Sequence, residues 1–142
     1  MPPLDADECR RRFTAARVAT LATTNADGRA DLVPVTYALV GDMILTAVDH
    51  KPKSTRRLRR LDNIARQPAV ALLADHYTDD DWAALWWVRA HGTATVSDEV
   101  PGSVLDALVA KYAPYADAPP AGPFIVVPVD RWSGWAATAA RS

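Results

Sequence analysis

The stretch "VATLATTNADGRADLVPVTYALVGDMILTAV", residues 18–48, decides how this chain folds. It holds three runs of β-branched and apolar residues, at 18–23, 29–40 and 43–48, which we predict to be three strands of an antiparallel meander. Asp27-Gly28 and Gly41-Asp42 separate these runs and are typical of tight turns. Pro34 has no N–H to donate to a neighbouring strand, so we expect an edge position, a bend or a bulge in the long second strand.

The rest of the chain adds a few helices and three more strands. Residues 6–16 are predicted to form a helix with Asp5 as its N-cap, and a second helix should begin after its own N-cap, Ser54. A shorter helix is expected at 104–112. The further strands are predicted at 69–75, 82–96 and 124–130. Six strands joined mostly by hairpins predict a mainly β (α+β) fold, in which a small antiparallel barrel carries a few flanking helices.

Composition limits what the chain can be. A sequence of 142 residues, 49% hydrophobic and 23% charged, predicts a single domain over residues 1–142 with one core. The net charge of −1 gives no general indication of binding to nucleic acid or to a membrane surface. Cys9 is the only cysteine, which rules out a disulfide within the chain. The charged first residues and the lack of a run of roughly 18 apolar residues predict a cytoplasmic protein without a membrane segment.

Positive charge is concentrated between residues 51 and 60. The cluster consists of Lys51, Lys53, Arg56, Arg57, Arg59 and Arg60. It could be a solvated helix face. It could bind nucleic acid, but no aromatic residue is interleaved with it, which argues against that interpretation. It could also bind phosphate, because lysines before a helix, a serine cap and the free N–H groups of the first turn all favour an anion at one point.

The two strands before this cluster offer a place for the body of a phosphate-bearing ligand. Residues 32–40 and 44–48 are expected to run beside each other just before the basic loop. A planar ring laid along them could bond to backbone groups near Val35 and Thr36 on one strand and Thr46 and Ala47 on the other.

The order of these motifs resembles a known superfamily. A strand, an Asp-Gly turn, a strand with "VPV", a hairpin, a strand, "KPKS" and an Arg-rich helix before "VALL" resemble the flavin-reductase-like split β-barrels, which include the pyridoxamine phosphate oxidases. More closely, the chain is similar to the deazaflavin (coenzyme F420)-dependent oxidoreductases, from about Phe13 to Val96 and on to "RWSGW". The resemblance implies a six-stranded split barrel, a homodimer with cofactor sites at its interface, and hydride transfer to a small organic substrate.

The resemblance also implies roles for single residues. The cofactor's phosphate-bearing tail would be held by Lys51, Lys53, Ser54 and Arg57. The resemblance leaves open whether Arg56 or Arg60 assists. The ring system would lie along Val35, Thr36 and Tyr37, with Thr46 and Ala47 on the neighbouring strand. Asn63 would support the helix structurally, and no catalytic residue is implied.

The five tryptophans fall in two groups, and two interpretations stay open for them. They could pack the core or a dimer interface, since aromatic side chains contribute strongly to both. Alternatively, Trp86 or Trp135 could form a wall of the ring pocket. Loops at 75–82 and 113–123 are expected to shape that pocket. The three histidines show no metal-ligand spacing, so we expect no metal site.

Two other functions remain compatible with these motifs. The same scaffold binds FMN, and a phosphate monoester favours lysine and arginine as much as a phosphodiester-linked tail does. The barrel could also be a non-catalytic protein that carries a cofactor or another anionic pigment such as haem or a bilin.

Overall fold

The structure of the protein, a computed structural model, describes residues 3–48 and 55–138, with side chains in the second range described from residue 59 onward. Its helices are α1 (Ala6–Ala15), α2 (Thr55–Arg66), the 3-10 helix η1 (Trp82–Ala84), α3 (Gly102–Lys111) and α4 (Ala113–Asp117). Its strands are β1 (Ala19–Thr24), β2 (Ala30–Val35), β3 (Ala38–Val40), β4 (Met43–Ala47), β5 (Ala69–His76), β6 (Trp86–Thr93), β7 (Thr95–Ser97) and β8 (Phe124–Ala136).

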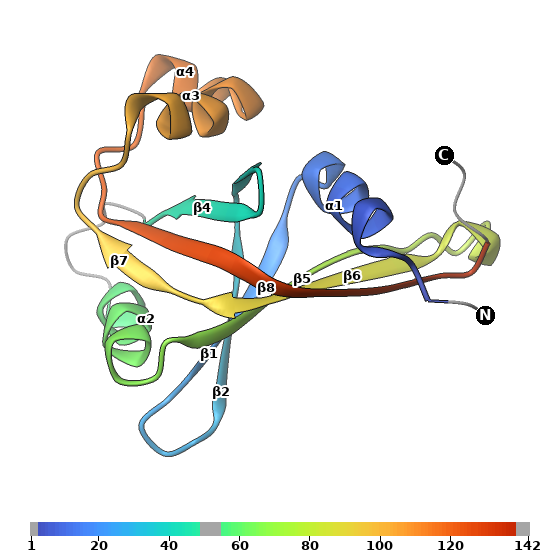
Figure 1. The fold of residues 1–142 in the computed structure, drawn as a ribbon, viewed down its shortest axis with the longest axis horizontal. Coiled ribbons are helices and arrows are strands. Elements are labelled where there is room, and N and C mark those ends of the chain that lie inside the picture. Colours follow the sequence, from blue (N-terminus) through green and yellow to red (C-terminus); the bar gives the residue numbers. More distant parts are fainter. Residues whose placement is uncertain (1–2, 49–54, 139–142) are drawn as a thin grey trace.

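The strands form an antiparallel sheet that curls back towards its own beginning (Figure 1). Its order is β2-β1-β5-β6-β8-β4-β3, and β7 pairs with β8 beside this path. β2 and β3 therefore stand at the two ends of the path, although only Thr36 and Tyr37 connect them in the chain. Two residues cannot span a flat sheet of this width, so the sheet has to curl. This confirms the mainly β, antiparallel split-barrel fold.

β8 is the strand that joins the two parts of the barrel. Its first half pairs with β4 on one side and β7 on the other, and its second half pairs with β6. The register between β6 and β8 shifts at His91 and Gly92. A Cβ atom on Gly92 would lie 2.3 Å from the Pro128 carbonyl oxygen, so this close approach needs a glycine.

The predicted number of six strands is wrong, because residues 3–48 and 55–138 already form eight. The predicted strand 29–40 divides into β2 and β3, and only its last three residues pair with β4. The predicted strand 82–96 divides into β6 and β7, preceded by η1. The last strand is longer than predicted, since β8 continues from residue 130 through "RWSGW" alongside β6.

The break in the second predicted strand has a physical cause. Tyr37 turns out of the sheet and is fully buried, with its hydroxyl donating to the Phe13 carbonyl and lying 3.3 Å from the Ala16 carbonyl. A strand that continued straight could not place this ring under α1. The expectation of an edge position for Pro34 is confirmed, because β2 pairs only with β1 along the main path.

Helix α1 forms as its sequence predicts, and it packs against β8, β6 and β3. The Asp5 carboxylate accepts a hydrogen bond from the Glu8 N–H at 2.8 Å, which confirms the N-cap. Cys9 and Phe13 lie on the inner face and are fully buried. Gly134 allows the approach, because a Cβ atom there would lie 2.9 Å from the Cys9 Sγ atom.

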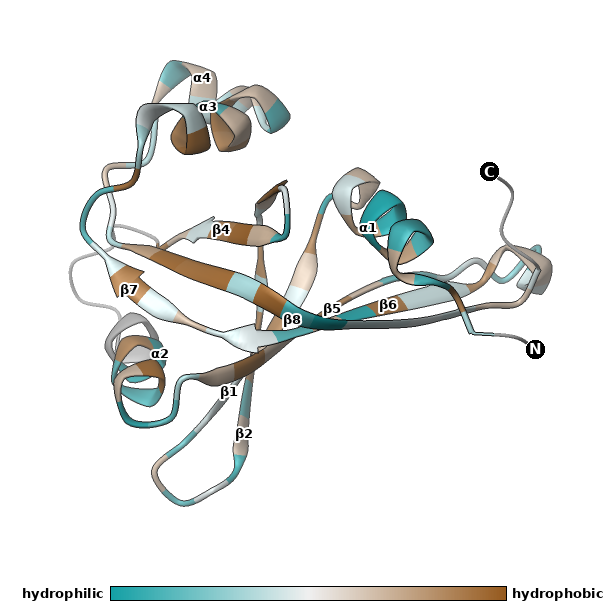
Figure 2. Cartoon of the chain, viewed as in Figure 1, coloured by the Kyte–Doolittle hydropathy of each residue, from teal (hydrophilic) through white to brown (hydrophobic). Residues whose placement is uncertain are grey.

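Helices α3 and α4 form a separate cover over β3 and β4 (Figure 1). Figure 2 shows apolar residues on α3, on β4 and on the first half of β8, where they form a second core cluster. Its buried members are Ala38, Leu45, Val104, Leu108, Tyr112 and Phe124. The sequence predicts α3 closely but not α4, which lies in the proline-rich segment. None of the helices in the described parts of the chain has the length and apolarity that a membrane crossing requires.

Candidate functional site

A pocket of about 580 Å³ lies between the edge of β2 and the end of β4. Helix α2 contributes to it from one side, and α4 with the segment after it from another. Its lining residues are Val33, Pro34, Val35, Thr36, Thr46, Ala47, Val48, Arg60, Tyr115, Ala118, Pro119 and Pro120.

The pairing of the strands explains why a pocket forms here. β2 pairs with β1, whereas β4 pairs with β3 and β8, so β2 and β4 are not neighbours in the sheet. β3 begins at Ala38, opposite Leu45, so Thr46 and Ala47 extend beyond the part of β4 that pairs with β3. The split between the two strands therefore leaves the Val35–Thr36 and Thr46–Ala47 segments facing one cavity.

Three hydroxyl groups give this cavity a polar wall. The Thr46 Oγ1 donates to the Thr36 carbonyl oxygen at 2.8 Å and ties the two strands together. The Thr36 Oγ1 and the Tyr115 Oη lie 3.0 Å apart, and either can be the donor. This second bond holds α4 over the pocket.

The basic residues named from the sequence are described only in part. Lys51, Lys53 and Ser54 lie outside the described residues, and so do the side chains of Arg56 and Arg57, although α2 includes both positions. Arg60 lines the pocket, whereas the adjacent Arg59 lines a different one together with Asn25 and Asp27. Consecutive helix positions point in different directions, so only some of the arginines reach the first pocket.

The structure brings together four of the five residues named for the ring. Val35, Thr36, Thr46 and Ala47 all line the pocket. Tyr37 does not, because its ring lies in the core, 4.4 Å from the Phe13 ring. Burial raises the pKa of the Tyr37 hydroxyl well above its ordinary value.

Behind the pocket wall, Tyr112 fixes the backbone that follows Thr36. Its hydroxyl accepts from the Tyr37 N–H at 3.1 Å and lies 2.9 Å from the Arg17 carbonyl oxygen. The Lys111 Nζ lies 3.9 Å from the centre of the Tyr37 ring, and it is buried with no hydrogen-bond partner among the described residues. Burial, and then the charge of Arg17, lower the pKa of Lys111 to about 8.

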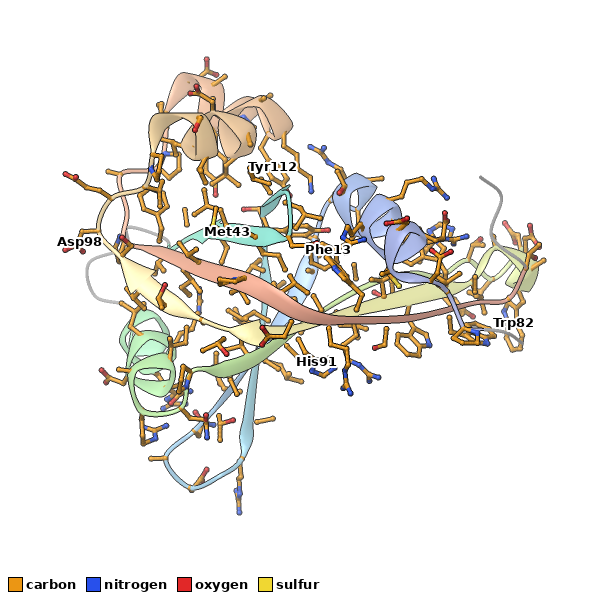
Figure 3. All side chains as sticks on the ribbon, in the orientation of Figure 1. Phe13, Met43, Trp82, His91, Asp98 and Tyr112 are labelled. Atoms are coloured by element: carbon orange, nitrogen blue, oxygen red, sulfur yellow. The ribbon has the colours of Figure 1, made fainter. Side chains whose placement is uncertain are left out.

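Trp86 and Trp135 do not line the pocket. They lie at the start of β6 and the end of β8, at the end of the sheet opposite α2, α3 and α4 (Figure 1). Trp86 packs against the main core, with the Arg12 guanidinium 5.6 Å from the centre of its ring. Figure 3 shows Trp82 at this same end, far from Tyr112. The loop at 75–82 lies there too, whereas Tyr115 and residues 118–120 of the other predicted loop do line the pocket.

Two other polar residues, Asn63 and His91, lie outside the lining of this pocket. Asn63 is buried and donates to the Thr23 hydroxyl at 3.1 Å and the Asn25 side chain at 2.9 Å, so it joins α2 to β1. His91 lies on the outer face of the sheet, and burial lowers its pKa, with Arg131 and then Arg89 adding to the effect. Within the described residues, no group of three or more His, Cys, Asp or Glu side chains could hold a metal ion.

The sequence did not identify Tyr115 or the residues after it as single site residues. The only signal is the proline-rich composition of 113–123, which indicates an irregular segment but not its position. Tyr115 reaches the pocket because α3 and α4 fold back over β3 and β4, and no local pattern specifies that packing.

Comparison with known proteins relates this architecture to one family. Residues 6–136 match the family model described as pyridoxamine 5'-phosphate oxidase. A search of curated proteins finds no match.

Several solved structures share the fold. A conserved hypothetical protein from Mycobacterium tuberculosis is 23% identical, with a TM-score of 0.71 over 94% of this chain and 86% of that one. An FAD-binding protein from Mesorhizobium loti is 22% identical, with a TM-score of 0.68 over 94% and 93%. The FAD-binding protein from Mycobacterium smegmatis is 17% identical, with a TM-score of 0.65 over 94% and 97%.

Proposed function

Because this chain belongs to the pyridoxamine 5'-phosphate oxidase family, we propose that its pocket between β2, β4 and α4 binds a flavin-type cofactor and that the protein is an oxidoreductase. The cofactor we propose is coenzyme F420, on the resemblance of residues 13–96 to the deazaflavin-dependent members of the superfamily. One observation carries the proposal. Val35, Thr36, Thr46 and Ala47, which the sequence associates with a ring system, line a single pocket that Arg60 also reaches.

The residues of the pocket suit a ring with an anionic tail. Valine, alanine and proline side chains offer apolar walls for the ring, and backbone groups near Val35 and Ala47 would bond to its polar edge. Lys51, Lys53 and Ser54 fall within the six residues between Val48, which lines the pocket, and the start of α2. With Arg57 and Arg60 on α2, they would hold the phosphate-bearing part.

The reaction we propose is hydride transfer to an electrophilic carbon of a small organic substrate. A bound deazaflavin in its two-electron-reduced form would supply the hydride and become oxidised, which is the chemistry that the protein itself lacks. The part of the protein is to hold cofactor and substrate face to face and to limit the access of water. The segment from Tyr115 to Pro120 covers the pocket and would serve that second purpose.

FMN is the second candidate cofactor, and a specific observation favours it. Two similar structures are described as FAD-binding proteins, which are proteins that bind a true flavin. Hydride transfer to an acceptor, measured with each bound cofactor, separates an enzyme from a protein that only carries the cofactor.

The test is an equilibrium titration of the purified apoprotein with coenzyme F420 and, in parallel, with FMN, followed by fluorescence. We expect selective binding of F420, and that Arg60→Ala weakens it roughly tenfold or more, because a lost charge-assisted hydrogen bond costs about 1.5–3 kcal/mol. Arg59→Ala is the matched control, because Arg59 lines the other pocket. Tighter binding of FMN would move the proposal to a flavin enzyme, and binding of neither cofactor would refute it.

We further propose that the protein is a homodimer. Leu32, 65% exposed on β2, and Leu73, 38% exposed on β5, lie on the same outer face of the sheet, because they stand opposite Ala22 and Thr20 of β1. An exposed apolar sheet face of this kind favours association with a second copy. Light scattering after size-exclusion chromatography should give twice the mass of 15.4 kDa, and Leu32→Glu should shift the protein towards the monomer.

A further inference from the structure

The hydroxyl groups at the α4 end of the pocket leave one hydrogen unused. The Thr46 hydroxyl donates its hydrogen to the Thr36 carbonyl oxygen, at 2.8 Å. The Thr36 and Tyr115 hydroxyls bond to each other at 3.0 Å. Two hydroxyls carry two hydrogens, and one mutual bond uses only one of them.

The second hydrogen remains available at the wall of the pocket. Within the part of the chain that the structure describes, neither the Thr36 nor the Tyr115 hydroxyl has another hydrogen-bond partner. Both side chains are half-buried and both line the pocket. A donor in this position is satisfied when a ligand brings an acceptor to it.

The surroundings of this donor favour an uncharged acceptor. The neighbouring lining residues are apolar, and they include Val35, Pro119 and Pro120. Among the lining residues that the structure describes, only Arg60 carries a charge, and it belongs to α2, on the other side of β4 from α4 (Figure 1). A charged ligand group at the α4 end would lose its hydration without gaining an opposite charge.

From this arrangement we infer that the α4 end of the pocket binds an uncharged substrate with an apolar body through its carbonyl oxygen, with the Thr36–Tyr115 hydroxyl pair as the donor. The inference rests on the proposed function, since it takes this pocket to be the ligand site, and it adds the chemical class of the substrate. Thr36 and Tyr115 are then specificity-determining residues.

Two probes that differ in one group test the inference directly. 2-Acetylnaphthalene carries a carbonyl oxygen where 2-isopropenylnaphthalene carries a methylene group, and the two compounds have nearly the same shape. Binding of each is measured by isothermal titration or by fluorescence, with the protein saturated with the cofactor that it binds, or with the protein alone if it binds neither F420 nor FMN. We expect the wild-type protein to prefer the ketone about threefold to tenfold, as one net hydrogen bond allows.

Substitutions that remove one or both hydroxyl groups of the Thr36–Tyr115 pair test the donor itself. Thr36→Val leaves the Tyr115 hydrogen free, and Tyr115→Phe leaves the Thr36 hydrogen free, so each single variant should keep the preference for the ketone. The double variant has neither donor, so its affinity for the ketone should fall to that for the alkene or below it, while its affinity for the alkene stays unchanged. Tyr77→Phe, which alters an exposed hydroxyl bonded to Asp79, is the control and should behave as wild type.

Other results would overturn the inference. A purely structural role of the two hydroxyls would weaken ketone and alkene equally in the double variant. A preference for the ketone that survives in the double variant, or no preference in the wild type, or no binding of the ketone up to its solubility limit, would each contradict a carbonyl-binding pair.

The cofactor titration keeps this inference separate from the proposed function. Loss of the ketone preference in a double variant that still binds F420 or FMN supports both. A wild-type protein that shows the ketone preference but binds neither cofactor would refute the proposed cofactor and leave the carbonyl site in place. A wild-type protein that binds F420 or FMN but shows no preference for the ketone would refute only the inference.

Discussion

Tyr112 should stabilise the protein through its hydroxyl group more than any exposed tyrosine does. The hydroxyl accepts from the buried Tyr37 N–H at 3.1 Å and lies 2.9 Å from the Arg17 carbonyl oxygen. It thereby connects α3 to the two residues that join β2 and β3. Tyr112→Phe removes the oxygen and keeps the ring, so the packing of the second core cluster is preserved.

The loss of stability in Tyr112→Phe comes from the backbone groups that no longer have the Tyr112 hydroxyl as a partner. The Tyr37 N–H loses the acceptor provided by Tyr112 inside the protein, and an unsatisfied buried group costs about 1–3 kcal/mol. Loss of the bond to the Arg17 carbonyl adds up to about 1 kcal/mol, because water can replace part of it. We expect the free energy of unfolding to fall by about 2–3 kcal/mol, which is roughly 5–10 °C in Tm for a chain of this length.

Urea unfolding at neutral pH, followed by circular dichroism, measures this difference. Tyr77→Phe is the matched control, because the Tyr77 side chain is exposed and its hydroxyl bonds only to Asp79 among the described residues. The control should stay within about 0.5 kcal/mol of wild type. If Tyr112→Phe unfolds at the same urea concentration as Tyr77→Phe, the reasoning about the Tyr37 N–H is wrong.

Two further predictions concern the core and the sheet. The pKa of Lys111 is lowered to about 8, first by burial and then by Arg17, so the unfolded chain binds this proton more tightly than the folded protein does. Wild type should therefore gain stability relative to Lys111→Met as the pH rises. The difference between their free energies of unfolding should increase by about 1–2 kcal/mol between pH 8 and roughly pH 10, a value reduced for the partial exposure of the side chain. Urea titrations measure this difference, and a value that does not change with pH would contradict the lowered pKa. Gly92→Ala should destabilise the fold by about 3 kcal/mol or more, because its Cβ would meet the Pro128 carbonyl oxygen at 2.3 Å. Gly102→Ala, where nothing lies within 4 Å of the new Cβ, should leave the thermal midpoint nearly unchanged or slightly raised, and equal effects at the two glycines would refute the argument from close approach.

The local patterns of the sequence identify most of the elements. The turns at Gly28 and Gly41 form as predicted, with φ angles of 86° and 62° that favour glycine. Asp5 caps α1, and Cys9 and Phe13 face the core because helical periodicity places them on one side. These features depend on neighbours within a few residues, so the sequence alone contains the information.

The pairing of the strands required the tertiary structure. The run at 29–40 reads as one strand, but Tyr37 leaves the sheet to bury its ring beside Phe13, which comes from a distant helix. Likewise, the number of strands depends on where β8 changes partners from β7 and β4 to β6. Neither event has a signature in the residues that undergo it.

The sequence by itself determined the turns, the helices α1, α2 and α3, and the core face of α1. It also identified four residues that meet in one pocket, which are Val35, Thr36, Thr46 and Ala47. Their meeting was predictable because hairpins place residues close in sequence side by side. Only the tertiary structure decided that Tyr37 lies in the core, that Trp86 and Trp135 lie at the far end of the sheet, and that Tyr115 completes the pocket. The physical reason is that these placements depend on packing between segments up to 80 residues apart, as in the Thr36–Tyr115 bond, where the separation is 79.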